Sequence, residues 1–105
     1  MSRRVVITGL GIFSSIGNSF DEITFNLKAG ISGITKVQAW EELGIKSCLA
    51  GESKGVVEKM ETSGISKKIF NCMSEAAIMG TLAAQDAFAD ANINSQEMAL
   101  RDIAC

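Results

Sequence analysis

The chain has 105 residues, 47% of them hydrophobic and 21% charged, with a formal net charge of −2. This length allows at most one ordinary domain, and this composition buries surface, which excludes a disordered polypeptide. The scattered basic residues argue against a nucleic-acid partner. No apolar run approaches the length of a membrane span, and the opening MSRRVVITGLG lacks the organisation of a signal peptide. We therefore expect a cytoplasmic protein without a membrane partner. The apolar composition favours a piece of a larger core over a self-sufficient domain.

The chain contains no histidine, and its three cysteines, Cys48, Cys72 and Cys105, are far apart. An odd number of cysteines without a C-x-x-C pair favours reduced thiols over a disulfide framework. Without histidine there is no Ser–His or Cys–His pair and no imidazole ligand. We therefore expect neither a complete catalytic site nor a metal site within the chain.

The chain opens with a β-branched run, Arg4–Thr8, which predicts a buried strand suited to a parallel sheet. A loop rich in glycine and serine follows, over Gly9–Gly17. A strand followed by G-x-G and a helix is also a feature of dinucleotide-binding turns. Here Ser14 occupies the third glycine position, and no acidic residue ends a second strand about 20 positions on. We favour a turn that needs positive φ and close packing.

The middle of the chain predicts short elements. A helix is expected over Phe20–Lys28, with Asn18 or Ser19 as its cap and Gly30 after its end. A short helix is expected over Lys36–Leu43, with Gly44 as its stop, and a short strand over Ser47–Gly51. A polar, irregular excursion should follow over Glu52–Gly64, and a helical lead-in over Ile65–Cys72.

The strongest element is a helix over Ser74–Ala91, with Ser74 as its cap and Asn92 as its stop. Small residues at i, i+3 and i+4 spacing form one face and allow a neighbouring backbone to come close, namely Ala76, Gly80, Ala83, Ala87 and Ala91. A last strand is expected over Arg101–Cys105. This order of elements predicts an α/β protein with a mostly parallel sheet.

Two thiols, those of Cys72 and Cys48, are candidate nucleophiles. Cys72 lies just before the Ser74 helix, where a helix N-terminus favours a thiolate. No histidine is present to pair with it, and Phe70 and Met73 beside it are apolar. A buried, inert thiol is the better interpretation, and the same holds for Cys48.

Two charged pairs are weighed in the same way. Lys67 and Lys68 offer adjacent cations to an acidic partner or a phosphate, although most such pairs are simply solvated. Asp86 and Asp90 have i, i+4 spacing, which is compatible with a metal or an acid–base site. Like charges at this spacing disfavour a helix, so a solvated edge or a pairing with a cation elsewhere is the simpler interpretation.

Four segments together carry a family resemblance. The first, Arg3–Asn18 (RRVVITGLGIFSSIGN), contains a strand, a T-G-L-G turn and an S-x-I-G-N step. The second, Leu27–Ile34 (LKAGISGI), is a helix end with its loop. The other two are Phe70–Ala76 (FNCMSEA) and Ala87–Ala91 (AFADA). This series resembles the β-ketoacyl-acyl carrier protein synthases, the condensing enzymes of fatty-acid synthesis. Ser15, with Met73-Ser74-Glu75, makes the chain most similar to the type I branch.

The resemblance implies a thiolase-like α/β fold of alternating helix and sheet layers (αβαβα). Residues 1–105 would form the N-terminal portion of the ketosynthase domain, truncated before the nucleophile segment and inactive alone. The implied enzyme is a homodimer that condenses an acyl thioester with malonyl-acyl carrier protein, without a metal or redox cofactor. The family's cysteine nucleophile and two histidines lie in later segments, so no catalytic residue is assigned here.

The resemblance also implies one binding site. Lys67 and Lys68 match a basic position that contacts the acidic acyl carrier protein in type I synthases. Asn71 stands where the family has a further basic residue, which weakens this patch.

Two alternative functions remain. One is a non-catalytic truncated or split module that binds an acidic carrier protein or completes another chain's sheet. The other is a nucleotide-binding oxidoreductase, which rests on Gly9 and Gly11 alone.

Overall fold

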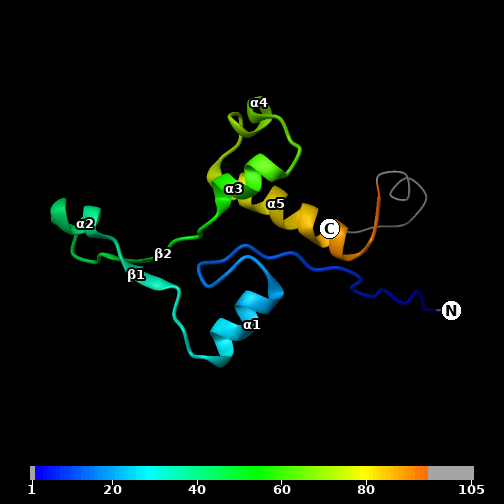
Figure 1. The fold of residues 1–105 in the computed structure, drawn as a ribbon, viewed down its shortest axis with the longest axis horizontal. Coiled ribbons are helices and arrows are strands. Elements are labelled where there is room, and N and C mark those ends of the chain that lie inside the picture. Colours follow the sequence, from blue (N-terminus) through cyan, green and yellow to red (C-terminus); the bar gives the residue numbers. More distant parts are fainter. Residues whose placement is uncertain (1, 95–105) are drawn as a thin grey trace. The chain divides into compact units, whose positions relative to one another are not determined.

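The computed structural model describes residues 2–94 (Figure 1). Its helices and strands are, in chain order, α1 (Phe20–Lys28), β1 (Ile34–Lys36), α2 (Gln38–Glu42), β2 (Leu49–Gly51), α3 (Val56–Thr62), α4 (Lys67–Phe70) and α5 (Glu75–Asp90). They form two compact units. Unit 1 contains residues 2–12 and 57–94 of the described chain, and unit 2 contains Phe13–Val56. Within residues 2–94, no helix is both long and apolar enough to cross a membrane.

Side-chain caps begin the two longest helices. The Ser19 hydroxyl accepts a hydrogen bond from the Glu22 amide at 3.3 Å at the start of α1. The Ser74 hydroxyl accepts one from the Ala77 amide at 3.3 Å at the start of α5. Each bond satisfies an amide that has no partner within its helix. The predicted bounds of α1 are confirmed, those of α5 agree to within one residue at each end, and Ser19 rather than Asn18 is the cap.

Three helices end in the same backbone motif. The residue after the C-cap has a positive φ in α1, α2 and α5, at Gly30 (+68°), Gly44 (+72°) and Asn92 (+54°). Its amide and the next one donate to carbonyls of the last helical turn, which is the Schellman arrangement. Glycine adopts this conformation freely, and asparagine tolerates it better than most other residues. The three predicted helix stops are confirmed.

The strands of unit 2 pair antiparallel. Ile34 is opposite Gly51, and Lys36 is opposite Leu49. The predicted strand at Ser47–Gly51 is confirmed over its last three residues, whereas the helix expected from Lys36 begins at Gln38 because Lys36 belongs to β1. The expectation of a mostly parallel sheet is wrong for residues 2–94, where β1 and β2 are the only sheet. The chain between them reverses direction, which brings the strands together antiparallel.

The predicted strand over Arg4–Thr8 is also wrong, because the segment has no strand assignment within residues 2–94. Val5, Val6 and Ile7 are 90%, 65% and 83% exposed. β-Branched residues favour an extended backbone, but a strand forms only when a neighbour pairs with its amides and carbonyls. The predicted strand over Arg101–Cys105 lies outside the described residues.

The backbone after this segment packs closely against α5 (Figure 1). A β-carbon on Gly11 would overlap the Ala83 carbonyl oxygen, and one on Gly9 would lie 2.7 Å from the Ala91 β-carbon. Between them, the Leu10 amide donates to Asp90 Oδ2 at 3.0 Å. The small-residue face of α5 therefore receives a backbone, as predicted, along the part that begins at Ala83.

One predicted loop is a helix. The polar stretch Glu52–Gly64 contains α3, so the expectation of an irregular excursion is wrong. Val56 and Met60, one helical turn apart, are half-buried. On the neighbouring helix, Gln85 Nε2 donates to the Ser63 carbonyl at 3.0 Å just after α3 ends. The centre of α3, Glu58–Glu61, consists of good helix formers, so the polar composition of this stretch is compatible with a helix. The lead-in at Ile65–Cys72 contains α4, as predicted.

We predict opposite effects for alanine at two glycines of unit 1. Gly11→Ala should lower the free energy of unfolding by about 1–3 kcal/mol, because the added methyl group overlaps α5. Gly80→Ala should raise it by about 0.5–1 kcal/mol, because the site is helical and open and alanine is the better helix former. Urea unfolding of both variants measures this difference, and equal effects would contradict the close backbone contact.

Candidate functional site

The first candidate is the glycine-rich turn, and α5 occupies the space beside it. Gly9 and Gly11 lie against the Ala83–Ala91 part of α5. In a dinucleotide-binding turn, the corresponding glycines leave room for a pyrophosphate at a helix N-terminus. Here the same space is taken by the helix backbone. The packing interpretation of these two glycines is confirmed, although neither has a positive φ.

The predicted carrier-protein site lies on α4, which contains both Lys67 and Lys68. Both lysines are exposed. Phe70, the last residue of the helix, is only 2% exposed and anchors α4 in unit 1. Successive helical residues are rotated by about 100°, so Lys68 lies nearly opposite Phe70 and faces outward. The exposed Asn71 follows as the C-cap.

Cys48 and Cys72, the two cysteines within residues 2–94, are far apart in the sequence and differ in exposure. Cys72 is exposed, so the expectation of a buried thiol is wrong. Phe70 is the residue of this segment that turns inward, and Cys72 follows in the turn after α4. Cys48 is half-buried, and its thiol donates to the Ile45 carbonyl at 3.2 Å. Cys105 lies outside the described residues.

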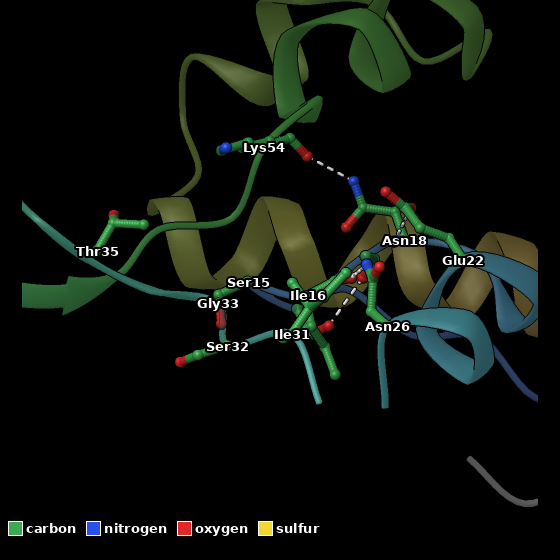
Figure 2. Close-up of a pocket in the computed structure, with 12 residues that line it drawn as sticks. Ser15, Ile16, Asn18, Glu22, Asn26, Ile31, Ser32, Gly33, Thr35 and Lys54 are labelled. Atoms are coloured by element: carbon green, nitrogen blue, oxygen red, sulfur yellow. Dashed lines mark hydrogen bonds between the residues drawn. The ribbon is translucent and has the colours of Figure 1, made fainter. Parts of the chain in front are cut away.

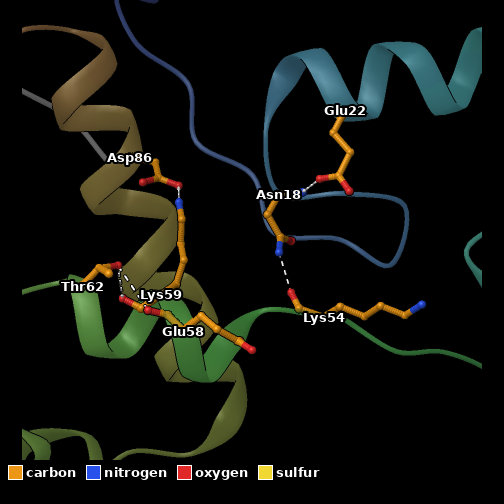
Figure 3. A network of polar contacts seen from close by, with 7 residues as sticks. All are labelled: Asn18, Glu22, Lys54, Glu58, Lys59, Thr62 and Asp86. Carbon is orange, nitrogen blue, oxygen red and sulfur yellow. Dashed lines mark hydrogen bonds and ion pairs between the residues drawn. The ribbon is translucent and has the colours of Figure 1, made fainter.

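Both aspartates of α5 have structural partners. Asp86 forms an ion pair with Lys59 of α3 (Figure 3), and Asp90 accepts the Leu10 amide. The predicted pairing with a cation is confirmed for Asp86. Across the described residues, no three acidic, cysteine or histidine side chains are grouped closely enough to hold a metal ion. The Lys59–Asp86 ion pair joins α3 to α5 rather than forming a reactive site.

Unit 2 contains a cavity of about 190 Å³ beside the turn that precedes α1 (Figure 2). Its lining contains both polar and apolar residues, among them Ser14, Ser15 and Ile31. Asn18 connects two parts of its wall, because its backbone amide donates to Glu22 and its side-chain amide donates to the Lys54 carbonyl (Figure 3). The buried Asn18 Oδ1 accepts no hydrogen bond within the described chain.

The sequence predicted neither this cavity nor α3, and it did not identify Lys59 as the cation that pairs with Asp86. The helical spacing of Val56 and Met60 is a usable signal for α3, and Lys59 lies within that spacing. No local signal identifies Asp86 as the partner of Lys59, because the two residues are 27 positions apart.

Comparison with known proteins decides the family. Residues 2–105 match the family model described as beta-ketoacyl synthase, N-terminal domain. The chain belongs to this family. It is 38% identical to 3-oxoacyl-acyl-carrier-protein synthase 1 of Haemophilus influenzae over 91% of the chain. It is 40% identical to the synthase 1 of Escherichia coli strain K12 over 90% of the chain.

The chain is less similar to a plant synthase II. The chloroplastic 3-oxoacyl-acyl-carrier-protein synthase II of Arabidopsis thaliana is 29% identical over 92% of the chain. The higher identity to the bacterial synthases 1 confirms the predicted similarity to the type I branch. The chain spans 23% of the length of the Haemophilus relative and 22% of that of the Escherichia coli relative. The small mixed helix and strand structure is consistent with the ketosynthase N-terminal domain.

We predict that the Lys59–Asp86 pair stabilises unit 1. A double-mutant cycle of Lys59→Met and Asp86→Asn should give a coupling of about 0.5–1 kcal/mol, because the two side chains are only 33% and 36% exposed. The coupling should fall in about 1 M NaCl, where charges are strongly screened. The Lys36–Glu41 pair, 57% and 56% exposed, is the control and should couple more weakly. Equal coupling for the two pairs would contradict this role.

Proposed function

We propose that the chain is the N-terminal segment of a 3-oxoacyl-acyl-carrier-protein synthase, which condenses an acyl thioester with malonyl-acyl carrier protein. The family match over residues 2–105 carries this proposal, and the bacterial synthases 1 support it. Residues 1–105 form the start of a thiolase-like ketosynthase domain, with the nucleophile segment outside them. The exposed Val5–Ile7 segment supports a place within a larger core.

In the proposed reaction, an acyl group passes from its carrier to a cysteine thiolate. Malonyl-carrier protein loses carbon dioxide, and the resulting carbanion attacks the acyl thioester. A carbon–carbon bond forms and the cysteine leaves as a thiolate. The chain contains no histidine for the decarboxylation step, so its own contribution is scaffold and carrier docking. The enzyme works as a cytoplasmic homodimer, without a metal or redox cofactor.

A chimera tests this function. The matching segment of Escherichia coli synthase 1 is replaced by this chain, and condensation of acyl- with malonyl-acyl carrier protein is assayed. We expect the chimera to be active and the isolated chain to be inactive, because the chain has the family's scaffold without histidine. The same chimera carrying Gly11→Val is the control and should lose its fold, since the added side chain overlaps α5. A chimera that melts cooperatively but does not condense would contradict the proposal.

The carrier protein docks through Lys67 and Lys68, the exposed cations of α4. Lys67→Glu/Lys68→Glu should weaken binding of acyl carrier protein to the chain roughly tenfold at low salt, through lost attraction and added repulsion. Isothermal titration calorimetry measures this change. Lys28→Glu/Lys46→Glu, which reverses two exposed charges of unit 2, is the matched control and should bind as the unaltered chain does. Equal losses in the two variants would show that net charge alone drives binding.

A non-catalytic module is the second candidate. The exposed β-branched segment Val5–Ile7 favours it, because such residues suit a strand that pairs with another chain's sheet. Mixing the isolated chain with a synthase 1 that lacks the matching segment separates the two proposals. Restored activity in the mixture supports a split module, and activity in the covalent chimera alone supports a segment of one synthase.

A further inference from the structure

The α4 segment combines cations with an exposed apolar side chain. Ile69 follows Lys67 and Lys68 directly and is 55% exposed. The exposure does not arise from a loose helix, because Phe70 at the next position is buried at 2%. The burial of Phe70 determines which side of α4 faces solvent.

Helical geometry places these side chains relative to one another. With Phe70 inward, a rotation of about 100° per residue puts Lys68 near the centre of the outer face. Lys67 and Ile69 lie on opposite sides of it. The exposed side chains of α4 are therefore two lysines and one isoleucine, within a single helical turn.

Such a surface suits a partner of one kind. Cations alone attract any polyanion, and that attraction is screened by salt. An apolar side chain beside them adds affinity for an acidic protein that has an apolar side chain between its carboxylates. The free energy gained by burying these two apolar side chains is not screened by salt. An acidic protein with an apolar patch is therefore complementary to α4 in both charge and hydrophobicity.

We propose that Ile69 is part of the docking surface and contacts an apolar side chain of the acidic acyl carrier protein. This inference rests on the proposed carrier docking and deepens it. Lys67 and Lys68 speed encounter and orient the carrier, and Ile69 supplies the part of the affinity that resists salt. It also selects a folded acidic protein over a simple polyanion.

Binding of Escherichia coli holo-acyl carrier protein to the chain tests this, at about 0.05 M and about 0.5 M salt, two conditions chosen to differ strongly in screening. Ile69→Ser should weaken binding about fivefold at both salt concentrations, the loss expected for one partly exposed side chain. Lys67→Glu/Lys68→Glu should weaken it mainly at low salt. Poly-glutamate is the second probe, and its binding should depend on the lysines and not on Ile69.

Leu43→Ser is the matched control, because Leu43 is 76% exposed in unit 2 and should not affect binding. Circular dichroism checks that each variant keeps the helix content of the chain. If Ile69→Ser binds the carrier as the unaltered chain does while the lysine variant does not, the role of Ile69 is overturned and carrier docking stands. If no variant changes binding, or the chain does not bind the carrier, both proposals are overturned.

Discussion

Unit 1 depends on the close approach of the Gly9–Gly11 backbone to α5. The contact brings together parts of the chain 80 positions apart, and the Leu10–Asp90 hydrogen bond lies at its centre. It requires glycine at both positions, because a β-carbon at either would overlap α5. The T-G-L-G turn and the alanine face of α5, which look unrelated in the sequence, are two halves of one contact.

The same unit presents the candidate docking surface. Phe70 and Leu82 are its buried hydrophobic side chains within the described residues, and the Lys59–Asp86 pair joins α3 to α5. Burial of Phe70 orients α4, so the direction of Lys68 depends on the packing of unit 1. In the proposed synthase, this segment is thus linked through packing to the opening turn of the chain.

In the proposed synthase, the chain contributes scaffold and the exposed basic surface of α4. It contains no histidine, its exposed Cys72 has no assigned role, and its acidic side chains on α5 hold other elements in place. Membership suggests the reaction, and the structure indicates which residues are available for a carrier protein.

The sequence by itself determined the features that depend on neighbours in the chain: the Ser74 cap, the stops at Gly30, Gly44 and Asn92, the span of α5 and the family motifs. Only the tertiary structure decided that Arg4–Thr8 lacks a strand partner within residues 2–94, that residues 56–62 are helical, and that Cys72 is exposed. Caps and turns are satisfied by atoms a few residues away. Strand pairing, burial and ion pairs require partners that only the folded chain brings close.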